Sequence, residues 1–166
     1  MRKYYAGPAA LIILVMALAG CAAGISQQAR SQVTYAGTFR ALQKDPGRYQ
    51  GQTVMLGGKI LQTQAMEGAT EIVVLQLELN SSDRPQDNDQ SQGRFIIRSS
   101  GFLDPAIYPP GALITVVGTV QTNEVRPIGQ MAYRYPVIKL VEIKKWPAAG
   151  QTSPSFHFGF GVGTSF

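Results

Sequence analysis

The chain of 166 residues contains one cysteine and one histidine, Cys21 and His157. A zinc site needs three or four converging His, Cys or acidic ligands, so we expect no such site. His157 lies in a glycine-rich segment with no scaffold to position it, which argues against a Ser-His-Asp arrangement. A single cysteine forms no internal disulfide, so stability must come from burial. We predict no catalytic residues, no metal and no cofactor.

Charged residues make up 15% of the chain, and they are scattered. The sequence pI is near 9.5, but the densest basic cluster is the pair Lys144-Lys145. Proteins that bind nucleic acid usually cluster their cations, so we predict no nucleic-acid partner. Attraction to anionic lipid headgroups is the weaker inference that the charge allows.

Long hydrophobic runs are also missing. The apolar run over residues 9–17 is too short to span a bilayer, which takes about 20 apolar residues. It follows Arg2 and Lys3 and precedes small residues, a pattern typical of a secretory signal peptide over residues 1–20. An ordinary signal peptide followed by an incidental cysteine is one interpretation. The other follows from Leu18-Ala19-Gly20-Cys21, which resembles a bacterial lipobox and is favoured because the single cysteine occupies the required position.

The lipobox resemblance implies that Cys21 becomes the mature N-terminus, with lipid on its sulfur and palmitate on its amine. Several acyl chains together give stable membrane anchoring. Ala22 and Ala23 stand where an Asp would retain such a protein in the inner membrane. The resemblance therefore implies the outer membrane of a Gram-negative cell, and we expect its periplasmic face. Residues 21–33 are small and polar, which predicts a flexible tether.

Residues 34–146 are expected to form one domain. A short helix is predicted to start at Thr34, to place Tyr35, Phe39 and Leu42 on one face, and to end at Asp45-Pro46-Gly47. Apolar alternation then predicts five strands, at residues 53–61, 70–79, 94–98, 113–120 and 135–143. We predict an all-β fold, a small five-stranded OB-like barrel preceded by a short N-terminal helix. An open β-sandwich is the alternative.

Several local features refine this prediction. Gly57-Gly58 interrupts the first strand and suggests a bulge or a sharp coil. In the last strand, alternation groups Val137 with Ile143 on one face and Ile138 with Leu140 on the other. A loop is expected around residues 126–129, before that strand. Residues 100–111 contain three prolines and predict one helical turn between loops.

Acidic residues offer few sites. Asp87 opens a segment with calcium-loop spacing, but Gln92 and Arg98 replace the required Gly and Glu, so we predict a solvated loop. Asp104 is expected to cap the turn that Pro105 begins. An envelope hydrolase, the least favoured function, would rest on scattered carboxylates such as Asp104 and Glu67.

The C-terminal segment, residues 147–166, has no Lys, Arg, Asp or Glu and alternates phenylalanine with glycine. A disordered tail and an apolar strip that contacts lipid or a partner are both consistent with this composition. We expect a tail that is mobile in isolation and gains order on contact, with Phe158 and Phe160 supplying that contact.

Several segments together resemble the Slp family of outer-membrane lipoproteins, which are starvation-inducible or stationary-phase proteins of Gram-negative bacteria. The resemblance rests on the lipobox, on residues 46–51 and 57–60, on Ser100-Gly101-Phe102-Leu103-Asp104-Pro105 with Tyr108, and on residues 114–120. It implies an outer-membrane location and a setting of envelope stress or stationary phase. It implies no catalytic residues.

The resulting hypothesis is a non-enzymatic envelope module with a protein or lipid partner. The alternative is a glycan- or peptidoglycan-binding OB-fold, because OB-folds bind oligonucleotides or oligosaccharides across one face. Aromatic residues in or beside the expected barrel would supply the platform that a sugar needs: Tyr49, Phe95, Phe102, Tyr108, Tyr133 and Tyr135. Among them, Tyr133 is the predicted contact.

Overall fold

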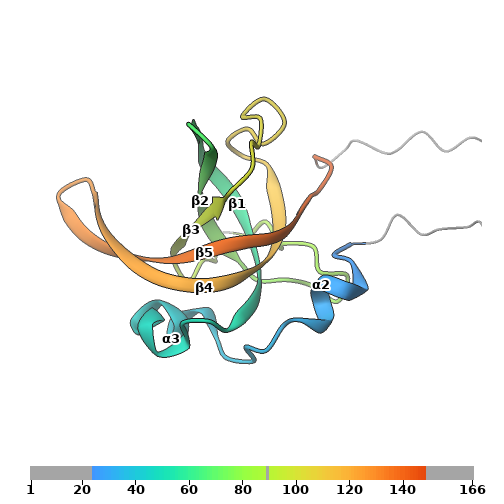
Figure 1. Ribbon diagram of the computed structural model, residues 1–166, viewed down its shortest axis with the longest axis horizontal. Coiled ribbons are helices and arrows are strands. Elements are labelled where there is room, and N and C mark those ends of the chain that lie inside the picture. The colour runs from blue at the N-terminus through green and yellow to red at the C-terminus, as the bar shows by residue number, and fades with distance from the viewer. Residues whose placement is uncertain (1–23, 89, 149–166) are drawn as a thin grey trace, which may run out of the picture.

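The computed structural model describes residues 24–88 and 90–148. Two short helices, α2 (Gln27–Ser31) and α3 (Phe39–Lys44), and a 3₁₀ turn, η1 (Pro46–Tyr49), precede the strands. The five strands are β1 (Thr53–Met66), β2 (Ala69–Leu77), β3 (Arg94–Ser99), β4 (Leu113–Ile128) and β5 (Met131–Lys145). The prediction of an all-β fold with five strands is therefore confirmed (Figure 1).

The strands close into a barrel in the order β1-β2-β3-β5-β4. β1 pairs with both β2 and β4, and β3 runs parallel to β5. This order is that of an OB-fold, which confirms the predicted architecture over the β-sandwich. Closure leaves few free edges on strands whose backbone groups would otherwise be exposed.

The glycine pair allows β1 to close the barrel. Gly57 and Gly58 each pair with β2 on one side and with β4 on the other. A Cβ atom at Gly58 would overlap Val74 Cγ1 and the Leu75 carbonyl oxygen. The strand passes through this point without a bulge, and its register shift falls later, between Ile60 and Gln62. The predicted close approach is confirmed, and its cause is the coiling of β1 between its two neighbours.

A bulge in β5 changes the predicted faces of that strand. Val117 pairs with Glu142 and Gly118 pairs with Leu140, which leaves Val141 without a partner in the ladder. One extra residue moves every later side chain to the other face. Ile143 therefore packs on the barrel core with Leu140, and the predicted grouping of Ile143 with Val137 is wrong.

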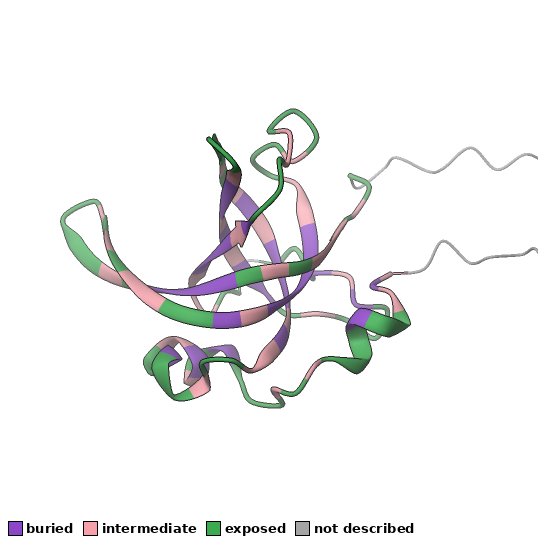
Figure 2. Cartoon of the chain, viewed as in Figure 1, coloured by how far each residue is buried: buried purple, intermediate pink, exposed green. Residues whose placement is uncertain are grey.

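The core fills the barrel and extends to α3, which closes one end of it. Figure 2 shows the buried positions along the strands and the exposed tip of the β4–β5 hairpin. The buried core residues are Phe39, Leu42, Val54, Leu56, Ile60, Ile72, Val74, Phe95, Ile97, Ile114, Val116, Val120 and Ile138. Burying each such side chain stabilises the fold by about 1.5–3 kcal/mol before entropy is counted.

Helix α3 starts later than predicted. The side chain of Thr38 accepts a hydrogen bond from the Ala41 amide and caps the helix, so the predicted start at Thr34 is wrong. The Thr34 and Tyr35 amides instead donate to the Thr53 carbonyl, which ties this segment to β1. The helix ends at Lys44, as Asp45 and Pro46 predict.

The segment expected to be a tether is packed on the barrel from residue 24 onward. Ile25 and Ala29 are buried against Val117, with Val33 and Met55 beside them. Ile25, Ala29 and Val33 recur every fourth position, which places them on one side of α2 and the residues that flank it. A flexible tether is thus wrong for residues 24–33, and residues 21–23 lie outside the described residues.

Replacing Gly58 by Ala tests the closure of the barrel. The new methyl group meets backbone as well as side-chain atoms, so we expect a loss of about 1–3 kcal/mol in the free energy of unfolding. The control is Gly101→Ala, whose Cβ would have its nearest neighbour at 3.8 Å. Urea denaturation followed by circular dichroism measures both. Equal stabilities for the two variants would contradict the steric role of Gly58.

Candidate functional site

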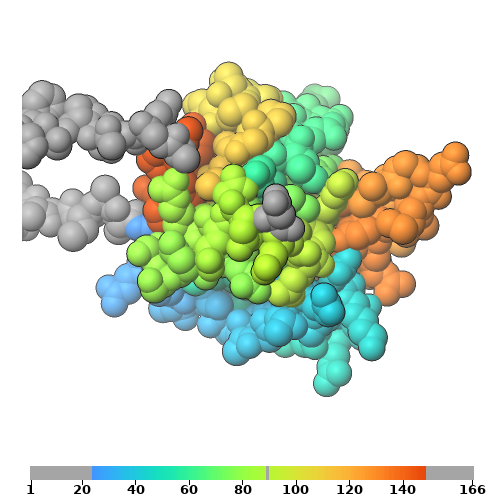
Figure 3. Space-filling view, turned by 180° about the vertical axis from the view of Figure 1, so that it is seen from behind, coloured from blue at the N-terminus to red at the C-terminus, as the bar shows by residue number. Residues whose placement is uncertain are grey.

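The β4–β5 hairpin, defined as residues 121–136, extends beyond the barrel and forms its most prominent projection (Figures 1 and 3). Tyr133 and Tyr135 on its inner face pack with Ile96 and Val73 of β3 and β2, and Ile128 joins the same cluster. Residues 126–129, expected to be a loop, are instead the end of β4 and the hairpin turn. The hairpin covers apolar positions on the outer face of β2 and β3 with its own aromatic rings.

Hydrogen bonds fasten the same contact. The Tyr133 hydroxyl oxygen accepts from the Arg94 amide at 2.6 Å and lies 2.6 Å from Gln43 Nε2, which also donates to it. Its ring meets that of Tyr135 edge-on at 4.7 Å between centroids. Burial raises the pKa of the Tyr133 phenol above its ordinary value, so the hydroxyl stays protonated at neutral pH. These contacts connect the hairpin to β3 and to α3.

An ion-pair network holds the β4 strand of the hairpin against β2 and β3. Glu71 of β2 is buried and accepts hydrogen bonds from Arg126 of the hairpin at 2.5 and 2.8 Å. Arg98 of β3 donates to the same carboxylate at 3.2 and 3.3 Å. Glu124 pairs with both guanidinium groups and completes a cluster of two cations and two anions. Bidentate pairing of this kind sets orientation as well as energy.

The network keeps both carboxylates ionised. Hydrogen bonds from Arg126, followed by those from Arg98, lower the pKa of Glu71 although burial acts in the opposite direction. For Glu124 burial is the largest single cause and raises the pKa, but the two arginines together outweigh it and the pKa is lowered. A general acid working near neutral pH needs a raised pKa. These carboxylates are therefore suited to holding the hairpin and not to proton transfer.

A cleft of about 310 Å³ lies where the hairpin leaves the barrel. It is lined by Arg98, Ser99, Ser100, Gln121, Thr122, Val137 and Lys139. Two cationic side chains and several hydroxyl groups stand among its lining residues. Because Arg98 already serves two carboxylates, Lys139 carries most of the charge that the cleft offers.

The structure does not gather the expected aromatic residues into a sugar platform. Phe95 is fully buried and Tyr135 nearly so, whereas Tyr49 and Tyr108 pack against the core. Phe102 has 70% of its surface exposed. The prediction that Tyr133 contacts a ligand stays a prediction, since its hydroxyl group is engaged inside the protein.

The acidic candidates have structural partners. The Asp104 side chain accepts from the Ala106 amide at 2.8 Å, which is the predicted cap. Asp87 pairs with Lys59. Glu67 lies exposed in the turn between β1 and β2. Nowhere in residues 24–88 and 90–148 do three His, Cys, Asp or Glu side chains gather in a way that could hold a metal ion.

Some predicted residues cannot be placed. Cys21, His157, Phe158 and Phe160 lie outside the described residues. Over the part of the chain that is described, no helix is long and apolar enough to cross a membrane.

Sequence reasoning missed the network and the hairpin. The signal was present, because Glu124, Arg126 and Ile128 alternate as they do on one face of a strand. Pro127 and Gly129 concealed it by favouring a loop.

Taken together, these features define a small OB-type barrel that carries a fastened hairpin. Residues 18–160 match the family described as "Outer membrane lipoprotein Slp family". The match covers most of the sequence, and the chain belongs to this family. It is a lipoprotein located in the outer membrane.

Two relatives from Escherichia coli strain K12 are similar in sequence. The outer membrane protein Slp is 27% identical over 158 residues, which cover 92% of this chain and 84% of that protein. The uncharacterized lipoprotein YeaY is 34% identical over 101 residues, or 61% of this chain. That second match spans about half, 52%, of YeaY.

Among solved structures, a small single-stranded DNA-binding protein from Streptomyces coelicolor covers 60% of this chain and 98% of its own. The sequence identity is 12% and the TM-score is 0.39. A TM-score this low supports no inference about this chain.

Substituting Glu71 by Gln tests the network. Loss of the charge leaves the guanidinium groups of Arg98 and Arg126 to share Glu124, so we expect about 1–3 kcal/mol lower stability at pH 7. Because the pKa of Glu71 is lowered in the folded state, its contribution is present above the unfolded value of about 4.3 and is lost as the pH falls further. Urea titrations at pH 7 and below pH 4 should therefore show a difference between wild type and variant that shrinks in acid.

The matched control is Glu67→Gln, at an exposed carboxylate. It should change stability by less than about 0.5 kcal/mol at either pH. A Glu71→Gln variant as stable as this control at pH 7 would contradict the role of the network.

Proposed function

We propose that this outer-membrane lipoprotein is a non-enzymatic interaction module, anchored through lipid on Cys21 at the periplasmic face, that presents its β4–β5 hairpin to a protein partner of the envelope. The observation that carries the proposal is the place of the hairpin. It projects at one end of the domain, and the two ends of the described chain, Gly24 and Ala148, lie at the other (Figure 1). An anchor at the N-terminal end leaves the hairpin directed away from it.

The outer face of the hairpin is suited to a protein surface. Val125 pairs with Arg134 across the two strands, and Pro127 pairs with Ala132. Val125 is 62% exposed, and Pro127, Ala132 and Arg134 on the same face are exposed as well. An apolar centre beside an arginine is typical of protein–protein contacts, in which Arg is enriched. The tyrosines of the hairpin face the barrel, so this surface lacks the rings that a sugar needs.

The absence of enzymatic activity is part of the proposal. Its support is the state of the carboxylates, because Glu71 and Glu124 are held ionised by arginines and Asp104 caps a turn. Glu71 and Glu124 both have a lowered pKa, so together they do not make the pair of raised and lowered pKa values that acid–base catalysis needs. A setting in stationary phase or envelope stress, which the family resemblance implies, completes the proposal.

The glycan- or peptidoglycan-binding alternative is favoured by one observation, the exposure of Phe102. A flat ring on the surface could stack on a sugar. The exposed ring stands alone, however, since the other aromatic residues considered above are partly or fully buried. We therefore rank this alternative second.

Photocrosslinking in cells tests the hairpin. A benzophenone amino acid at position 125 should give one adduct of defined mass, because a specific partner covers Val125. The same probe at Gln62, an exposed position on β1, is the control and should give no discrete adduct. With the probe moved to Ala132, an exposed position on the same face, a Val125→Asp substitution should reduce the adduct at least tenfold, since it places a charge in the apolar centre.

Identical products from positions 125 and 62 would contradict the hairpin as a partner surface. An adduct that is digested by a muramidase would show a glycan partner and would favour the alternative.

A further inference from the structure

The start of the described chain is held tightly against one end of the barrel. The Ser26 amide donates to Glu142 Oε1 at 2.7 Å, and the Ser26 hydroxyl donates to Oε2 at 2.5 Å. Arg30 of α2 forms an ion pair with Asp83, which is buried. These contacts join α2 to β5 and to the loop that follows β2.

Gly24 lies in the same corner. A Cβ atom placed on it would be 3.6 Å from Asp83 Oδ2 and 3.9 Å from the ring of Trp146. Cys21 precedes Gly24 by three residues, and a fully extended chain spans about 3.3–3.6 Å per residue. A lipid on Cys21 would therefore hold this end of the barrel within about 10 Å of the membrane surface. The inference below rests on that lipid but not on the hairpin partner proposed above.

The surface around Gly24 carries the chemistry of a membrane contact. Arg84 and Lys144 lie over the ring of Trp146, at 5.8 and 5.9 Å from its centroid. Lys145 is exposed next to them and donates to the Ile107 carbonyl at 2.8 Å. Within the described residues, none of these three cations lies in an ion pair with a carboxylate. Tryptophan is enriched at membrane interfaces, where one part of its ring is apolar and its N–H finds a partner.

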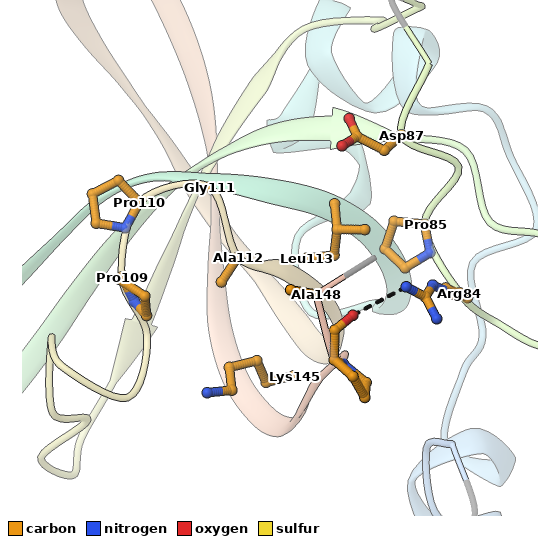
Figure 4. A pocket seen from close by; sticks show the side chains of 11 residues that line it. Arg84, Pro85, Asp87, Pro109, Pro110, Gly111, Ala112, Leu113, Lys145 and Ala148 are labelled. Carbon is orange, nitrogen blue, oxygen red and sulfur yellow. Dashed lines mark hydrogen bonds between the residues drawn. The ribbon is translucent and has the colours of Figure 1, made fainter. Parts of the chain in front are cut away.

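A cavity of about 620 Å³ opens beside these cations. Arg84 stands on one side of it and Pro109 and Pro110 on the opposite side, with Leu113 between them and Lys145 at its lower edge in this view (Figure 4). The one acidic side chain that lines it, Asp87, already pairs with Lys59. The cavity thus offers positive charge over an apolar floor, which matches a lipid phosphate and the first carbons of its chains.

We propose that this end of the barrel, defined by Arg84, Lys144, Lys145 and Trp146, docks on the membrane that holds the lipid anchor and binds the phosphate groups of anionic phospholipids. The short reach of residues 21–23 brings the two surfaces together, and the cations, which have no carboxylate partner within the described residues, supply complementary charge. Docking turns a single anchor point into a defined orientation. Each cation near an anionic surface strengthens the contact about fivefold.

The fluorescence of Trp146 reports docking directly, because it is the single tryptophan of the chain. The mature lipidated protein is placed in vesicles of phosphatidylethanolamine, with or without 30% (about one lipid in three) phosphatidylglycerol as the anionic probe. Quenching by lipids brominated near the headgroup is compared with the same vesicles without bromine. We expect strong quenching with phosphatidylglycerol and weaker quenching without it.

The test variant is the double substitution Lys144→Gln and Lys145→Gln, and Arg40→Gln on α3 is the control for loss of a cation elsewhere on the surface. At about fivefold per cation, the double variant should lower the ratio of docked to undocked protein about 25-fold and the control should leave it unchanged. Flotation with the vesicles confirms that every sample is anchored.

Three results would overturn the proposal. Equal quenching in both vesicle types would show that the anionic lipid is not the ligand. Equal quenching in the double variant and in Arg40→Gln would show that the two lysines do not contribute to docking. Failure of the wild-type protein to float would remove the anchor on which the inference depends, while leaving the hairpin proposal to its own crosslinking result.

Discussion

The contact between Ser26 and Glu142 fixes the start of the described chain on the barrel, and the orientation of the domain relative to its anchor depends on it. It joins the segment that follows the proposed lipid anchor to the last strand of the barrel, and the packing of Ile25 and Ala29 on Val117 supports it. A tether of ten or more free residues would let the domain turn in any direction. Because the chain is fastened from residue 24, the barrel keeps one end close to the anchor and the hairpin at the other.

The fold uses its charges to build this arrangement. Arg30 and Asp83 fasten α2, and Glu71 with Arg126 fastens the hairpin. Isolated ion pairs at a protein surface contribute little, but a buried carboxylate shared by two arginines is costly to disrupt. The outer face of β2 and β3, which many OB-folds use for ligands, is here covered in part by Tyr133 and Tyr135. The partner surface that we propose is therefore the exposed side of the hairpin.

The sequence predicted the barrel well because alternation, the glycine pair and Pro46 act locally. It failed where a distant contact decided the outcome. The bulge at Val141 reverses the face of Ile143 to suit the pairing with β4, and no local pattern reports that shift. The polar composition of residues 21–33 favoured a tether, although Ile25, Ala29 and Val33 have the spacing of one helix face. The candidate site was the least predictable part, since Glu71, Arg98 and Arg126 come from three strands and meet only in the closed barrel.

The central claim is that the domain has one orientation on the membrane, with the Trp146 end inward and the hairpin outward. With lipid on the thiol of Cys21, as proposed, an introduced cysteine is the single free thiol of the protein. Spin labels at Ala148→Cys and at Met131→Cys can be compared by electron paramagnetic resonance with a water-soluble nickel relaxation agent. On vesicles containing phosphatidylglycerol, the account predicts that the label at position 148 becomes inaccessible to nickel and the label at 131 stays accessible. Equal accessibility at both positions would contradict it.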